Sequence, residues 1–142
     1  MISPTGDQYT LTRGGARAVI TQVAAALREF VVDGVALTPG YPESSTPPFA
    51  SGIVLVPWPN RVEDGLWQLD GAPQQLDITE VARNNAIHGL LRYSGYRLLE
   101  RAEASVTLGA TVFPQHGYPF HLETSVQYLL VEDGLQVTHS IT

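Results

Sequence analysis

The chain has 142 residues, 44% of them hydrophobic and only 15% charged, so it is the size of one domain and can bury a core. Its formal charge of −6 argues against a nucleic-acid partner, because phosphates require clustered Lys and Arg. It contains no cysteine, which excludes disulfides and thiolate chemistry. The opening residues lack the layout of a secretion signal, and the apolar runs are too short to span a bilayer. We therefore expect a soluble cytoplasmic protein with no membrane partner.

The first predicted elements are two strands within residues 16–30, ARAVITQVAAALREF. Alanine favours helix, but Val19, Ile20 and Val23 are β-branched and no cap follows the segment. We therefore predict a strand, a short turn and a second strand. Asp33-Gly34 comes next, with strand-like residues on both sides, and both residues tolerate the positive φ of a tight turn. This pattern predicts a β-hairpin.

Residues 38–52, TPGYPESSTPPFASG, contain four prolines and are predicted to form a loop. Tyr41 and Phe49 lie within it, so we expect the loop to cover part of the protein surface.

The first candidate binding residue is Arg61, in VLVPWPNRVEDGLWQLDG. Pro57 and Pro59 end a strand-like run, because proline offers no N–H to a ladder, and Arg61 is expected where that strand meets a loop. An arginine can donate several coplanar hydrogen bonds to hydroxyl or carboxylate oxygens. The alternative is a surface arginine paired with Glu63 or Asp64.

The second candidate is His88, in RNNAIHGLLRY. A histidine titrates near neutrality and can exchange a proton with a sugar-like oxygen or donate a hydrogen bond to it. Gly89 would leave room beside it for a ligand or a second backbone, and Asn84 and Asn85 could hold the loop or reach the ligand. The alternative is a histidine that caps a turn.

Two further histidines lie in FPQHGYPFHLETSVQYLL, after a predicted strand at residues 105–113. His116 and His121 are five residues apart across Gly117 and Pro119, where no helix is expected, so this is not the layout of a helical zinc site and we predict no metal. Residues 117–120 are expected to form a turn into a strand, with aromatic rings packed beneath it.

Asp133-Gly134 predicts a second hairpin, and LQVTHSIT after it alternates as a strand does. His139 lies on one face of that strand and is expected to be structural. Because the sequence stops at Thr142, inside this pattern, we expect it to be the front part of something longer. SVQYLL and LQVTHSIT would then be sheet edges, which predicts pairing with another copy or another chain.

Many short strands at turn-marked intervals, with no internal repeat and no domain boundary, predict an all-β sandwich or barrel over residues 1–142. Phosphate-binding glycine loops and the Gly-x-Ser-x-Gly elbow are absent from the sequence.

Three of these stretches, in this order, resemble the aldose 1-epimerase (galactose mutarotase) family. PWPNRVEDGLWQLDG is similar to its Asn-Arg segment and hairpin, NNAIHGL to its His-Gly segment, and HGYPFHLETSVQYLL to its Gly-Tyr-Pro turn and following strand. The opening VITQVAAALREFVVDGVALTPGY resembles the family's first strands. The resemblance implies a large antiparallel β-sandwich, the galactose mutarotase-like supersandwich, of which this chain would be the N-terminal portion.

The resemblance also implies an isomerase that interconverts the α and β anomers of aldohexoses such as galactose or glucose, with no cofactor. The sugar-binding roles carry over to Arg61 and His88, with Asn60 and Asn85 as neighbours. The family's catalytic acid, a histidine, and its base, a glutamate, belong to segments that we do not find here and expect beyond Thr142, so the chain alone is expected to be inactive. A carbohydrate-binding β-sandwich without catalysis, or a purely structural β-domain, remains the alternative.

Overall fold

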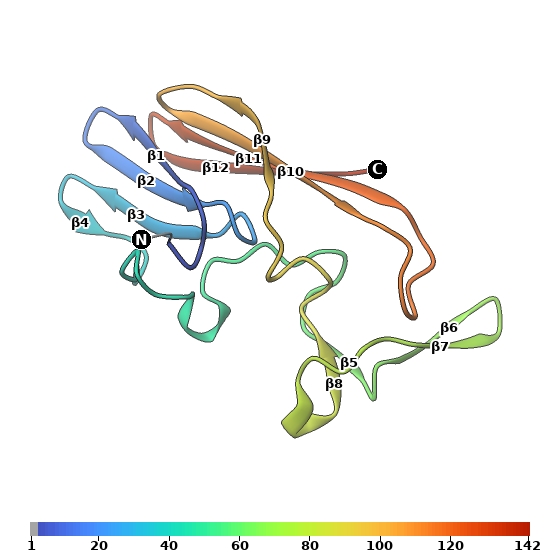
Figure 1. Ribbon diagram of the computed structural model, residues 1–142. Coiled ribbons are helices and arrows are strands. Elements are labelled where there is room, and N and C mark those ends of the chain that lie inside the picture. The colour runs from blue at the N-terminus through green and yellow to red at the C-terminus, as the bar shows by residue number, and fades with distance from the viewer. Residues whose placement is uncertain (1–2) are drawn as a thin grey trace.

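The computed structural model describes residues 3–142 as a β protein with two single-turn 3₁₀ helices (Figure 1). This confirms the predicted all-β class. The strands and helical turns are β1 (Gln8–Arg13), β2 (Ala16–Thr21), β3 (Leu27–Val32), β4 (Val35–Ala36), η1 (Pro48–Ala50), β5 (Arg61–Glu63), β6 (Leu66–Leu69), β7 (Ala72–Gln75), η2 (Val81–Arg83), β8 (Asn85–Ile87), β9 (Arg97–Arg101), β10 (Ser105–Val112), β11 (Leu122–Val131) and β12 (Gly134–Ile141).

The first sheet has the order β1-β2-β3-β4, and each strand is antiparallel to the next. The prediction of strand, turn and strand within residues 16–30 is confirmed by β2 and β3. The alanines between these strands serve burial rather than helix formation: Ala24 and Ala25 have positive φ, and both are fully buried. The Tyr128 hydroxyl of the second sheet donates a 2.7 Å hydrogen bond to the carbonyl oxygen of Ala25. Small residues fit this turn because the other sheet lies directly against it.

The second sheet has the order β12-β11-β10-β9, again antiparallel throughout. The prediction that SVQYLL forms an edge is wrong, because β11 is hydrogen-bonded to β10 on one side and to β12 on the other. The hairpin at Asp133-Gly134 folds β12 back along β11, so β12 is the edge strand on this side of the sheet. From Gln136 to Ile141 that strand is exposed. Pairing through this edge stays a prediction.

The ladder between β11 and β12 extends to Thr142. The Thr142 N–H donates to the Glu123 carbonyl oxygen at 2.9 Å, and the Glu123 N–H donates to the Thr142 carbonyl oxygen at 3.0 Å. The strand predicted from the alternation of LQVTHSIT is therefore confirmed through this residue. The expectation that the family's acid and base segments follow Thr142 stays a prediction.

The two sheets pack face to face, which makes the fold an antiparallel sandwich (Figure 1). Buried side chains alternate along the facing strands, as a sandwich core requires. Fully buried aliphatic members of this core are Leu11, Ile20, Val106, Leu108 and Leu130.

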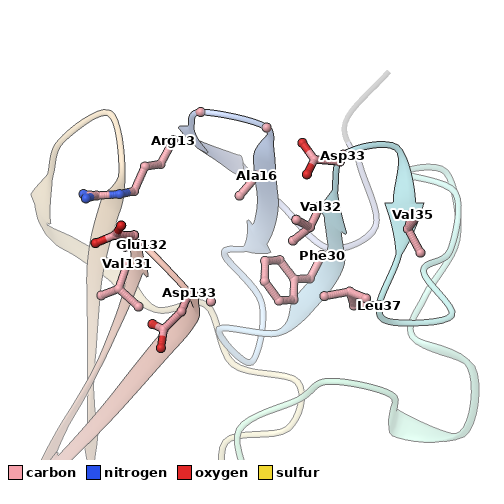
Figure 2. Close-up of a pocket in the computed structure, with 13 residues that line it drawn as sticks. Arg13, Ala16, Phe30, Val32, Asp33, Val35, Leu37, Val131, Glu132 and Asp133 are labelled. Carbon is pink, nitrogen blue, oxygen red and sulfur yellow. The ribbon is translucent and has the colours of Figure 1, made fainter.

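One end of the sandwich carries the turns between β1 and β2, β3 and β4, and β11 and β12. A cavity of about 720 Å³ opens there. Figure 2 shows Phe30, Val32 and Leu37 on one wall and Val131 on the other, with Glu132 and Asp133 in the β11–β12 turn. The cavity shares no lining residue with the Arg61–His88 region described below.

Between the sheets in sequence lie two small ladders, β5 with β8 and β6 with β7, that stand apart from the sandwich (Figure 1). The predicted loop at 38–52 is confirmed, with only the η1 turn inside it. Tyr41 is half-buried, but Phe49 points fully into solvent, so of these two aromatic residues only Tyr41 packs against the protein. Within residues 3–142 we find no helix of sufficient length and apolarity to cross a membrane.

Candidate functional site

The antiparallel pair β5–β8 brings the two candidate residues, Arg61 and His88, into neighbouring positions. Arg61 lies opposite Ile87 in the ladder. One step further, the His88 N–H donates to the Asn60 carbonyl oxygen at 2.8 Å, and the Asn60 N–H donates to His88 Nδ1 at 3.1 Å. Both Asn60 and His88 have left-handed backbone, with φ of 60° and 63°. The Arg61 and His88 segments therefore lie side by side in the fold.

The predicted position of Arg61 in the fold needs correction. Residues 53–56 form no strand beyond an isolated bridge between Val56 and Gly89, so Arg61 does not follow a strand but begins one, β5. The alternative pairing with Glu63 or Asp64 is also wrong, since its carboxylate partner is Glu80.

Gly89 allows the His88 segment to lie directly against residues 56–57. Its φ is +72°, and a Cβ at this position would overlap the backbone of Val56 and Pro57. The Leu90 N–H donates to the Val56 carbonyl oxygen at 2.7 Å on the far side of the glycine. The expectation that Gly89 leaves room for a second backbone is thus confirmed.

His88 is held as a neutral imidazole with its proton on Nε2. Because Nδ1 accepts the Asn60 N–H, it carries no proton, and Nε2 becomes the donor. Burial lowers the pKa of His88, and the positive charges of Arg92 and Arg61 lower it further. The imidazole therefore offers one N–H to a ligand oxygen at neutral pH.

Lowering the pH should weaken the fold through His88. The unfolded chain takes up this proton near pH 6.5, whereas the folded pKa lies lower. Below 6.5 the unfolded state binds more protons, so the free energy of unfolding falls with pH and levels off below the folded pKa. We expect His88→Gln to remove this component when urea unfolding is followed from about pH 7.5 to about pH 5. Identical pH dependence in both proteins would contradict it.

Arg61 makes a two-point ion pair with Glu80. Its Nε lies 2.7 Å from Glu80 Oε2, its Nη2 lies 2.8 Å from Oε1, and its Nη1 donates to Asn60 Oδ1 at 3.3 Å. The hydrogen bonds from Arg61 and from Asn85 lower the pKa of Glu80 to about 2, so it is ionised near neutral pH. The arginine side chain is 40% exposed. Three of its five N–H groups are engaged within residues 3–142, which leaves one on each terminal nitrogen for a ligand.

The two asparagines before His88 hold the loop. Asn84 has left-handed backbone and donates from Nδ2 to Asp64 Oδ1 at 2.6 Å. Asn85 is buried, and its Nδ2 donates to Glu80 Oε2 at 2.8 Å. Both side-chain amides are thus engaged by carboxylates of the protein.

A cavity of about 220 Å³ adjoins this segment. Gly89 and Arg92 line it together with Trp58, Asp77 and Tyr93, so its wall consists of residues that flank His88 rather than of Arg61 and His88 themselves. An indole face, an arginine and a carboxylate around one small space can contact both the carbon skeleton and the hydroxyls of a polar ligand.

The turn lies slightly earlier than the predicted residues 117–120, because Gln115 and Tyr118 are bridged across His116 and Gly117. Residues 119–121 then lead without regular structure into β11. The rings of Tyr118 and Phe120 pack edge to face at 5.3 Å, and Trp67 Nε1 donates to the Gly117 carbonyl oxygen at 2.8 Å. His116 lies 3.1 Å from Asp77. Among residues 3–142 no three His, Asp or Glu side chains cluster as a metal site would require.

Sequence reasoning missed Glu80 altogether. It lies 19 residues from Arg61, and a tight turn brings it close, because Glu80 and Asn85 are bridged across η2. The available signal was a pair of carboxylates, Asp77 and Glu80, shortly before the His-Gly stretch, of which Glu80 lies at a spacing that suits a short hairpin-like turn.

Comparison with known proteins places this geometry in context. A model of the aldose 1-epimerase family matches residues 7–142. YihR, an uncharacterized protein of Escherichia coli (strain K12), is 37% identical over 134 residues, which cover 94% of this chain and 44% of YihR.

Solved structures share the fold at low sequence identity. A GalM/aldose epimerase homologue from C. elegans superposes with a TM-score of 0.82 at 18% identity, covering 96% of this chain and 46% of that one. A putative aldose 1-epimerase from Escherichia coli K12 gives 0.80 at 22%, with coverages of 96% and 46%. Galactose 1-epimerase from Lactobacillus acidophilus NCFM gives 0.75 at 21%, with coverages of 95% and 43%. The chain thus spans a little under half the length of these relatives.

Proposed function

Because the chain belongs to the aldose 1-epimerase family, we propose that it carries the sugar-binding part of an enzyme that interconverts the α and β anomers of an aldohexose such as galactose or glucose. Arg61 and His88 are the proposed donors to the sugar. Asn60 orients both donors, because its N–H donates to His88 Nδ1 and its Oδ1 accepts from Arg61. Asn85 does not contact the sugar in this proposal but holds Glu80, the partner of Arg61.

The observation that carries this proposal is the proximity of two oriented donors, Arg61 at the start of β5 and His88 directly after β8. His88 offers Nε2–H as a neutral imidazole, and Arg61 offers an N–H on each terminal nitrogen. Sugar hydroxyls and the ring oxygen accept such hydrogen bonds, and two donors fixed by one ladder hold the ring in one orientation.

The reaction needs an acid and a base in addition to these donors. A base removes the proton of the C1 hydroxyl while an acid protonates the ring oxygen, and the ring opens to the aldehyde. Rotation about C1–C2 and closure on the other face give the other anomer, with each proton transfer contributing about 10²–10⁴-fold in rate. We propose that both groups belong to parts of the family's fold that residues 1–142 do not supply, since these residues match under half the length of the relatives, and that no cofactor takes part.

Sugar binding should depend on Arg61 and His88. In an NMR titration of the ¹⁵N-labelled chain with D-galactose and D-glucose, we expect shifts of the Asn60, Arg61 and His88 amides. Arg61→Ala or His88→Ala should each weaken the affinity by about tenfold or more, because each removes hydrogen bonds to the ligand. Arg97→Ala, at an exposed arginine beside Glu123 on the second sheet, is the matched control. Unchanged affinity in both site variants would refute the proposed roles.

Polarimetry tests whether residues 1–142 catalyse mutarotation without the proposed acid and base. The chain alone should leave the mutarotation rate of fresh α-D-glucose unchanged, since it lacks the proposed acid and base. Rapid mutarotation by the chain that His88→Ala abolishes would overturn the claim that the acid and base lie elsewhere. It would still agree with the proposed role of His88 in sugar binding.

A further inference from the structure

Glu80 occupies one edge of the Arg61 guanidinium and Asn60 accepts a further N–H, which leaves one N–H on each terminal nitrogen for a ligand. We propose that Glu80 is a positioning residue, which fixes the plane of Arg61 before the sugar arrives. This inference rests on the sugar-binding role of Arg61 proposed above.

The contact with Arg61 is suited to orientation. Both oxygens of Glu80 accept from the guanidinium, at 2.7 and 2.8 Å, and a two-point contact fixes both the position and the plane of the group. Arg61 lies at the surface, where an ion pair contributes little to stability. A long side chain held in one rotamer loses less conformational entropy when it binds a ligand.

Glu80 is itself held in place by hydrogen bonds to Asn85. Its N–H donates to the Asn85 carbonyl oxygen at 2.9 Å, the Asn85 N–H returns a bond of 3.2 Å to its carbonyl oxygen, and Asn85 Nδ2 holds its Oε2. Asn85 is only 8% exposed and belongs to β8. The chain of contacts from Asn85 through Glu80 to Arg61 therefore ties an exposed guanidinium to a buried strand.

The opposite role for Glu80 predicts the opposite result. If the carboxylate competed with the sugar for Arg61, its removal would strengthen binding. A positioning carboxylate is instead required with the ligand present, because the sugar takes the N–H groups that Glu80 leaves free. The direction of the change in affinity decides between the two roles.

The test is Glu80→Gln in the full chain, titrated with D-galactose by NMR. Glutamine keeps the size of the side chain but replaces one acceptor oxygen with a donor. We expect the affinity to fall about tenfold, because a two-point ion pair becomes a single hydrogen bond to an uncharged amide oxygen. In an Arg61→Lys background the same change should have little further effect, since lysine has no plane to orient. Tighter binding by Glu80→Gln, or an equal loss in both backgrounds, would overturn the proposal.

A second readout needs no sugar. Rotation of the guanidinium about Nε–Cζ, followed through the ¹⁵N resonances of Arg61, should be slow in the unmodified chain and fast in Glu80→Gln. Equally slow rotation in both would contradict positioning whether or not sugar binds. If the unmodified chain binds no sugar, the proposed function fails, and the rotation still decides whether Glu80 orders Arg61.

Glu29→Gln is the matched control, because Glu29 pairs with Arg17 on the first sheet, away from β5 and β8. It should change neither the sugar affinity nor the motion of Arg61.

Discussion

Gly89→Ala should lower the free energy of unfolding by about 2–4 kcal/mol, as measured by urea denaturation. Two costs combine at this position. Left-handed backbone with φ of +72° disfavours any side chain, and the added Cβ would overlap the backbone of Val56 and Pro57. To relieve this overlap, the His88–Gly89 segment must move away from residues 56–57, which would disturb the hydrogen bond between the Asn60 N–H and His88 Nδ1. Sugar binding should therefore weaken even under conditions where the protein stays folded.

Gly71→Ala is the matched control for Gly89→Ala. Gly71 also has positive φ, +80°, but a Cβ there would meet nothing within 4 Å. It should cost only about 1–2 kcal/mol, the penalty for left-handed backbone alone. Equal losses at the two positions would show that the close approach to Val56 contributes nothing.

The sequence was informative wherever the determinant is local. Asp33-Gly34 and Asp133-Gly134 mark hairpins because a tight turn depends on the φ preferences of its own residues. The prediction of strand, turn and strand within residues 16–30 was also correct, because β-branched residues at 19, 20 and 23 outweighed the helix preference of the alanines.

Partners distant in sequence were beyond the same reasoning. Arg61 was expected to pair with its neighbours Glu63 or Asp64, whereas the β5–β8 register and the turn at η2 select Glu80. The adjacency of Arg61 and His88 was reached through the family resemblance, since no local pattern determines which short strands pair. Their role as sugar donors stays a prediction.

The placement of β11 failed for a related reason. Alternation shows which face of a strand is buried, but it does not show how many neighbours the strand has. Val126, Tyr128 and Leu130 point into the core, as the alternation implies. Only the pairing with β12 on the open side shows that β11 is an inner strand.

Leu130→Ala measures the consequence of that inner position. Leu130 is 0% exposed and belongs to the core between the two sheets, so its side chain is enclosed on all sides. Truncation of an enclosed leucine leaves a cavity that the surroundings cannot fill, and the free energy of unfolding should fall by about 2–5 kcal/mol in urea denaturation.

Leu129→Ala provides the comparison on the same strand. Leu129 points to the opposite face and is half-buried, so its truncation removes contacts without enclosing a cavity and should cost about 1 kcal/mol. If the backbone of β11 could shift to fill the space left by the truncation, both substitutions would cause only small losses in the free energy of unfolding. A clear excess at Leu130 therefore reports that this face of β11 is enclosed in the core of the sandwich.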